Sequence, residues 1–196
     1  YLRIIIKMIY YKHTKKISFV QIEEEYTMEK RTVTFAGNPV ALVGPEVKVG
    51  QQAPDFKLID NQLAEKTLKD YAGKIKVISV VPSLDTGVCD AQTRWFNQDV
   101  TGLSPDVVVL TVSMDLPFAQ ARWCGAAGVE NVVTLSDHRD ASFGKNYGFL
   151  MDGLRLEARG VVVIDKNDQV TYVEYVPEVT HAIDFDGVLA AVKGML

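Results

Sequence analysis

The chain has few of the residues with which small proteins build disulfide frameworks or metal centres. Only two cysteines and three histidines occur among its 196 residues. Two cysteines cannot make a disulfide scaffold, and His13, His138 and His181 lie too far apart in the sequence to suggest the ligand set of a tetrahedral zinc site. We therefore expect neither a bound metal nor a cofactor.

An excess of one charge is also missing. The 21 basic and 25 acidic residues give a formal net charge of −4, and the basic residues do not alternate with aromatics as they would on a nucleic-acid surface. We therefore do not expect nucleic acid as a partner. With 47% hydrophobic residues the chain has enough apolar side chains for one core, but it is too short for two ordinary domains.

No hydrophobic run is long enough to span a membrane. Residues 1–11 are apolar but interrupted by Arg3 and Lys7, and they lack the pattern of a signal peptide. We expect residues 1–27 to be a non-native or disordered extension before a native start at Met28, with a basic anchor as the alternative. The domain would then span residues 28–196, without membrane contact. Two thiols without a secretory signal suggest the cytoplasm.

Hydrophobic periodicity predicts alternating strands and helices. Continuous apolar runs are typical of buried strands, and they occur at residues 76–81, 107–113 and 160–165, with a shorter strand at 132–135. Helices are expected at residues 88–100, 117–125, 141–147 and 185–196. A hairpin is expected over residues 31–43, turning at Gly37-Asn38-Pro39, and a second over residues 160–176.

This order of elements predicts the fold class. Strands separated by helices favour parallel pairing with helices on both faces of the sheet, and the two hairpins would add antiparallel strands at its edges. We therefore predict an α/β protein with a thioredoxin-like mixed β-sheet flanked by helices and an N-terminal β-hairpin.

Cys89 follows the first buried run at a position that favours thiol chemistry. Pro82 ends the run, and Thr86 is a suitable N-cap for the next helix. Cys89 would then lie in the first helical turn, where unpaired N–H groups and the helix dipole favour a thiolate. Many buried cysteines also lie near helix starts, so this spacing alone leaves an inert core thiol and a reactive thiolate equally open.

Three sequence motifs resemble those of one enzyme family. The segment PSLDTGVCDAQTR, which begins at Pro82, contains the Pro, Thr and Cys of the peroxiredoxin active-site loop. Together with RWC at residues 122–124 and LEARGVVVID at 156–165, it resembles the bacterial thiol peroxidases, a subfamily of atypical two-cysteine peroxiredoxins. The likeness runs from about Thr32 to the C-terminus, and residues 1–27 lie outside it.

The resemblance implies a role for each of five residues. Cys89 would attack a hydroperoxide and become a sulfenic acid, which Cys124 would resolve by forming an intramolecular disulfide. Thr86 would hydrogen-bond to the peroxide, Arg159 would hold a cation beside it, and Pro82 would close the pocket wall. The implied substrates are hydrogen peroxide and organic hydroperoxides, the implied reductant is thioredoxin, and the implied assembly is a homodimer.

Two other functions are alternatives to a peroxidase. A disulfide reductase of the thioredoxin type needs Cys-x-x-Cys at the helix start, but Thr86 occupies the position three before Cys89. A non-catalytic binding or holdase module with idle cysteines is the remaining alternative. The intact set of Pro82, Thr86, Cys89 and Arg159 argues against it.

Other residues near the motifs are expected to have ordinary structural roles. Asp85 and Asp90 would face solvent or N–H groups, Asp115 would cap the helix that starts at residue 117, and Phe118 has the spacing of a core residue. Because Cys124 belongs to a different helix, we expect the two sulfurs not to touch in the reduced fold. Disulfide formation would then unwind the first turn around Cys89.

Overall fold

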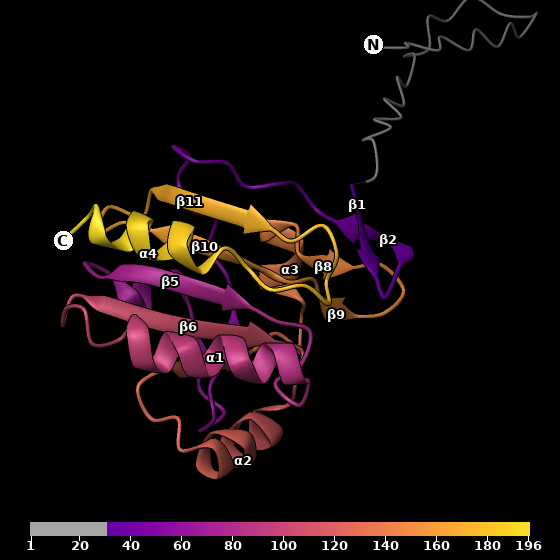
Figure 1. The fold of residues 1–196 in the computed structure, drawn as a ribbon, viewed down its shortest axis with the longest axis horizontal. Helices are drawn as coiled ribbons and strands as arrows, with labels where there is room; N and C mark the ends of the chain where they lie inside the picture. The colour runs from indigo at the N-terminus through magenta and orange to yellow at the C-terminus, as the bar shows by residue number, and fades with distance from the viewer. Residues whose placement is uncertain (1–30) are drawn as a thin grey trace, which may run out of the picture.

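The computed structural model describes residues 31–196, which form two β-sheets and four α-helices (Figure 1). The larger sheet has the strand order β11-β10-β5-β6-β7-β3-β4, and the smaller one has the order β1-β2-β8-β9. The expected extension over residues 1–27 and the expected start at Met28 lie outside the described residues.

The centre of the larger sheet contains the predicted buried strands. Strands β5 (Ile75–Val80), β6 (Val107–Ser113) and β7 (Val133–Ser136) are parallel neighbours. On the other side of β5, β10 (Gly160–Ile164) and β11 (Val170–Tyr175) form the predicted antiparallel hairpin. These predictions are confirmed.

The opposite edge of this sheet was not predicted. It consists of β3 (Leu58–Ile59) and β4 (Glu65–Lys66), which pair antiparallel with each other and join the sheet beside β7. A 3₁₀ helix over Leu68–Tyr71 follows. Strands of two residues are too short to show an alternating pattern, so hydrophobic periodicity gives no signal for them.

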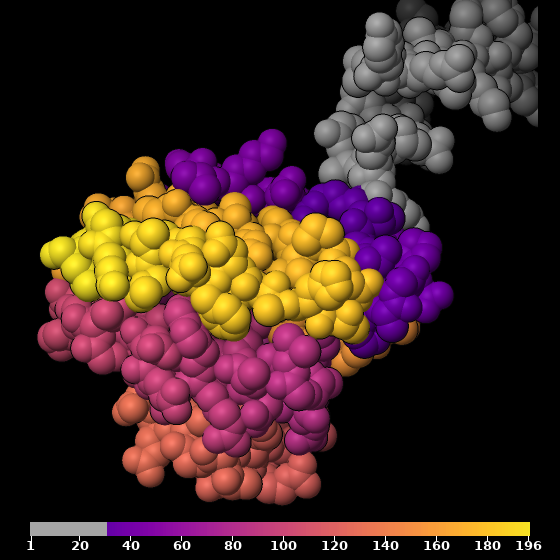
Figure 2. Space-filling view, viewed as in Figure 1, coloured from indigo at the N-terminus to yellow at the C-terminus, as the bar shows by residue number. Residues whose placement is uncertain are grey.

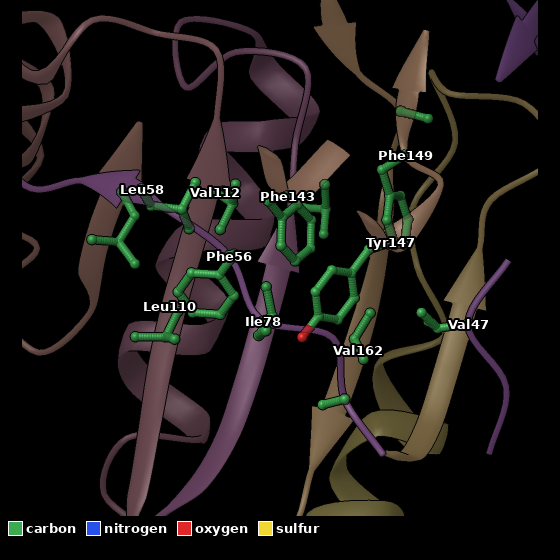
Figure 3. Close-up of a cluster of buried hydrophobic side chains, with 14 of the residues drawn as sticks. Val47, Phe56, Leu58, Ile78, Leu110, Val112, Phe143, Tyr147, Phe149 and Val162 are labelled. Atoms are coloured by element: carbon green, nitrogen blue, oxygen red, sulfur yellow. The ribbon is translucent and has the colours of Figure 1, made fainter. Parts of the chain in front are cut away.

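Helices cover both faces of the larger sheet, as predicted. Side chains of α1 (Gly87–Asp99), α2 (Pro117–Ala127) and α4 (Phe185–Lys193) share one apolar cluster with Ile75 and Val77 of β5. Ile78 and Val80 face the other cluster, which includes residues of α3 (Ser142–Tyr147) (Figure 3). The alternation along β5 therefore assigns each of its side chains to one of two buried layers.

The N-terminal hairpin consists of β1 (Thr32–Phe35) and β2 (Asn38–Val43). The predicted turn at Gly37-Asn38-Pro39 is wrong, because Asn38 already pairs with Phe35 and the turn residues are Ala36 and Gly37. Both turn residues have positive φ, 50° and 78°, as a two-residue turn requires if it is to follow the twist of its strands.

The expectation that this hairpin adds strands to an edge of the larger sheet is also wrong. Strand β2 pairs with β8 (Leu150–Met151), and β8 pairs with β9 (Leu156–Glu157). These four strands make a separate small sheet, which joins residues 32–43 to the segment just before Arg159.

None of the helices among residues 31–196 is long and apolar enough to cross a lipid bilayer.

A pair of buried carboxyl groups lies between α3 and β9. Asp137 accepts hydrogen bonds from the backbone N–H groups of Phe143 (3.2 Å) and Gly144 (2.8 Å). Burial raises the pKa of Asp137, and burial together with the nearby charge of Asp137 raises the pKa of Glu157 well above its usual range. Glu157 therefore favours its neutral, protonated form more strongly than Asp137 does.

We predict that Glu157→Gln raises the melting temperature at neutral pH. An unfolded glutamate is ionised above a pKa of about 4.3, so the parent must take up a proton at Glu157 on folding, whereas glutamine need not. The parent therefore loses stability relative to the variant as the pH rises above this value. Melting curves from about pH 4 to 8 should show a gain that disappears in acid. The exposed Glu65→Gln is the control, and a loss of stability at every pH would contradict the assignment.

Candidate active site

Cys89 lies in the first turn of α1, at the carboxyl end of β5. Its side chain is fully buried, although the four residues before it, Asp85 to Val88, are exposed. Thr86 is the N-cap residue, as predicted, with extended backbone angles. Its hydroxyl does not bond to the helix backbone but donates to Cys89 Sγ at 2.7 Å.

Arg159 presents its guanidinium to the same sulfur from the segment between β9 and β10. Nη2 donates to Cys89 Sγ at 3.2 Å, Nη1 donates to Gln92 Oε1 at 2.8 Å, and Nε donates to the Val179 carbonyl at 2.7 Å. Arg159 is itself buried, and a buried cation needs a compensating charge. Two of its three partners are neutral oxygens, so Cys89 is the partner that can supply this charge, as a thiolate.

Close packing fixes the position from which Arg159 enters the site. Gly160 follows it, and a Cβ atom at Gly160 would lie 2.1 Å from the Glu174 carbonyl oxygen and 2.6 Å from the ring of Phe149. The Arg159 carbonyl accepts a hydrogen bond from Val176 N at 3.0 Å. Only glycine lets the chain pass this close to β11. Gly160 therefore fixes the backbone position from which the Arg159 side chain extends to the site.

Gln92 is a site residue that sequence reasoning missed. Its Nε2 donates to Ser79 Oγ on β5 at 2.8 Å, which leaves its Oε1 oriented toward Arg159. Cys89, Gln92 and Phe96 are all buried residues of α1 at the spacing of one helix face. A polar glutamine on the buried face of a helix is a signal in the sequence that could have identified Gln92 as a site residue.

The loop that follows Pro82 is anchored by Asp115, which lies after β6. The Asp115 carboxylate accepts hydrogen bonds from Ser83 Oγ (2.7 Å), Leu84 N (2.8 Å) and Ser113 Oγ (2.8 Å). The prediction that Asp115 caps α2 is wrong, since Leu116 is the N-cap residue and makes no side-chain capping bond. The carboxylate is instead bound to the donors of the cysteine loop.

The other acidic residues near Cys89 point elsewhere, as predicted. Asp90 pairs with Arg94 at 2.8 Å, and Asp85 lies 3.6 Å from Arg122 at the surface. The expectation that Phe118 belongs to the core is wrong, because 68% of its surface is exposed at the start of α2.

Cys124 lies on α2, and its sulfur has a different polar partner from that of Cys89. Its Sγ is 3.7 Å from Thr134 Oγ1 on β7, which also accepts a hydrogen bond from Asn61 Nδ2 at 2.9 Å. Burial raises the pKa of the Cys124 thiol, and the hydrogen bond to Thr134 opposes this rise. Both cysteines are free thiols, and each sulfur has its own polar contact.

Metal ligands are not gathered in this site. Among residues 31–196, no three His, Cys, Asp or Glu side chains are arranged to hold an ion.

The chain is similar to proteins of known class over most of its length. The model of the Redoxin family matches residues 48–192. A thiol peroxidase of Oceanobacillus iheyensis is 58% identical over 158 residues, which are 81% of this chain and 96% of the relative. A thiol peroxidase of Bacillus subtilis is 56% identical over 164 residues, 84% of this chain and 98% of the relative. The crystal structure of a peroxiredoxin-like protein from Aquifex aeolicus is 43% identical, with a TM-score of 0.78 over 85% of this chain and 98% of that one.

We predict that Thr134→Val lowers the reactivity of Cys124 by about two- to fivefold. The change leaves the burial in place but removes the hydroxyl that opposes it, so the pKa of the Cys124 thiol rises further and less thiolate forms at a given pH. Alkylation by iodoacetamide in a Cys89→Ser background, where Cys124 is the remaining thiol, measures this directly. Thr134→Ser keeps the hydroxyl and is the matched control. Equal alkylation rates for the two variants would show that the hydroxyl does not act on Cys124.

Proposed function

This chain belongs to the Redoxin family, as a thiol peroxidase of the peroxiredoxin type, and we propose that it reduces hydroperoxides in a cycle that starts at Cys89. One observation carries the assignment of Cys89. Its buried sulfur accepts hydrogen bonds from Thr86 Oγ1 and from the buried guanidinium of Arg159, which is the environment of a thiolate rather than of an inert thiol.

In the first step, the Cys89 thiolate attacks the terminal oxygen of the peroxide. A sulfur–oxygen bond forms, the O–O bond breaks, and the leaving alkoxide or hydroxide takes up a proton to become alcohol or water. Arg159 stabilises the negative charge as it moves from sulfur to the leaving oxygen, and the Thr86 hydroxyl orients the peroxide. Pro82, which has no N–H group, closes the pocket wall without adding a donor.

In the second step, the Cys124 thiol attacks the sulfur of the Cys89 sulfenic acid. A disulfide forms and one water molecule leaves. A thioredoxin-type dithiol then exchanges with this disulfide, which restores both cysteines and leaves the reductant oxidised.

Three further features of the working protein belong to this proposal. Hydrogen peroxide and organic hydroperoxides are both substrates, and thioredoxin is the reductant, in keeping with the class of the relatives. Two free thiols suit a reducing compartment such as the cytoplasm. We also infer a homodimer from the resemblance to the bacterial thiol peroxidases, which sedimentation of the full chain would test.

We predict unequal effects of serine substitutions at the two cysteines. Cys89→Ser should abolish peroxide reduction, because it removes the attacking atom. Cys124→Ser should retain one fast turnover, in which the sulfenic acid forms, but should lose thioredoxin-supported cycling. Stopped-flow single-turnover kinetics with hydrogen peroxide and with cumene hydroperoxide would measure the first turnover, and peroxide consumption with thioredoxin and its reductase would measure cycling. Equal loss in the two variants would reject the assigned roles, and an inactive parent would favour a binding module.

We also predict that disulfide formation opens the start of α1. The exposed residues Asp85 to Val88 can unwind with little loss of buried surface, whereas Leu84 is held by Asp115. Hydrogen exchange at residues 84–92 and 118–126 should therefore be faster in the disulfide form than in the dithiol form. The amides of β5 and β6 are the internal control. Unchanged exchange in both segments would mean that the disulfide forms without unwinding.

A further inference from the structure

The orientation of Arg159 depends on a carbonyl in an irregular segment. Residues 177–180 lie in the connection between β11 and α4 and form no helix or strand of their own. The Val179 carbonyl in this segment accepts the Nε–H of Arg159 at 2.7 Å. A guanidinium is rigid and planar, so the anchor at Nε also determines where Nη1 and Nη2 point. Displacement of Val179 would therefore move the donor that reaches Cys89.

The N-terminal hairpin holds this segment through backbone hydrogen bonds. Thr34 N donates to the Pro177 carbonyl at 2.7 Å, and Val179 N donates to the Thr34 carbonyl at 2.8 Å. Figure 2 shows the indigo surface of the hairpin directly against the yellow surface of the late segment. The two segments lie far apart in sequence, and the hairpin lies outside residues 48–192, the part matched by the Redoxin family model.

The side chain of Glu178 strengthens this contact at the tip of the hairpin. Its carboxylate accepts the N–H groups of Ala36 and Gly37, each at 3.0 Å. These are the two turn residues with positive φ, and successive N–H groups in such a turn form a site for an anion. Ala36 has a Cβ atom and is strained in this conformation. The Glu178 carboxylate therefore stabilises a turn that the sequence does not otherwise favour.

Further donors keep this carboxylate charged. Thr180 donates its hydroxyl at 2.6 Å and its N–H at 3.1 Å to Glu178 Oε1. The Thr180 hydroxyl and the Gly37 N–H hold the pKa of Glu178 far below its usual range. Glu178 is therefore ionised throughout the neutral range and binds both the hairpin turn and its own segment.

We propose that Glu178 is a positioning residue for Arg159, which clamps the N-terminal hairpin to residues 177–180 and so holds the Val179 carbonyl that aims the guanidinium at Cys89. This inference rests on the proposed function only for the expected effect on the rate of peroxide reduction. It makes the hairpin part of the active-site support, although neither the hairpin nor Glu178 touches the sulfur.

The test is a double-mutant cycle between Glu178→Gln and Arg159→Lys. In a Cys124→Ser background, Cys89 is the remaining thiol, and its thiolate absorbance can be titrated without any peroxide. Glu178→Gln should shift this titration to higher pH. In the protein with both cysteines it should lower kcat/KM for peroxide by about three- to tenfold. Because Glu178 acts through Arg159, adding Glu178→Gln to the Arg159→Lys variant should cause neither the titration shift nor the loss of kcat/KM.

Two further variants separate positioning from stability. Glu65→Gln removes an exposed carboxylate at the far edge of the larger sheet and should leave the titration unchanged. If Glu178→Gln alone is too unstable to study, Ala36→Gly relieves the strained turn. The combined variant should then recover its melting temperature while its Cys89 titration stays shifted.

The outcomes distinguish this inference from the proposed function. An equal effect of Glu178→Gln in the parent and in Arg159→Lys would overturn the positioning role, as would a lower melting temperature with an unchanged titration. If the parent does not consume peroxide but the coupled titration shift is present, the proposed function fails and the positioning role stands.

Discussion

The burial of the Arg159 guanidinium is the constraint on which the rest of the site depends. A cation inside the protein is tolerated only where hydrogen bonds and negative charge compensate for lost water. Val179 and Gln92 supply neutral oxygens, and Cys89 supplies the sulfur that can bear the charge. The requirement is mutual, because the arrangement that makes the arginine tolerable also favours the thiolate.

The sequence predicted the parts of the fold that repeat a regular pattern. The buried runs that became β5, β6 and β10 were visible because continuous apolar strands are covered on both faces, and Thr86 was correctly placed at the start of α1. The sequence did not predict four strands, β3, β4, β8 and β9, because each has only two residues. The hairpin turn was misplaced because Asn38-Pro39 has turn-like composition, whereas the strained Ala36 does not.

The local sequence predicted site residues only where their role depends on their position in a helix or on a known motif. Gln92 was recognisable in principle, as a polar residue on the buried face of α1. Asp115 was misassigned because capping of α2 is a local rule, whereas its actual donors on Ser83 and Leu84 come from another part of the chain. The Val179 carbonyl had no signal at all, since every residue has a carbonyl and only the tertiary fold selects this one.

The contrast between buried Leu84 and the exposed residues Asp85 to Val88 has a consequence for the lifetime of the proposed enzyme. In the proposed cycle, a sulfenic acid formed at Cys89 would wait for this turn to open before Cys124 could reach it. During the wait a second peroxide molecule can oxidise the same sulfur to a sulfinic acid, which thiols do not reverse. If the proposed cycle holds, the ease of opening these four residues would set the peroxide concentration above which the protein is inactivated by its own substrate.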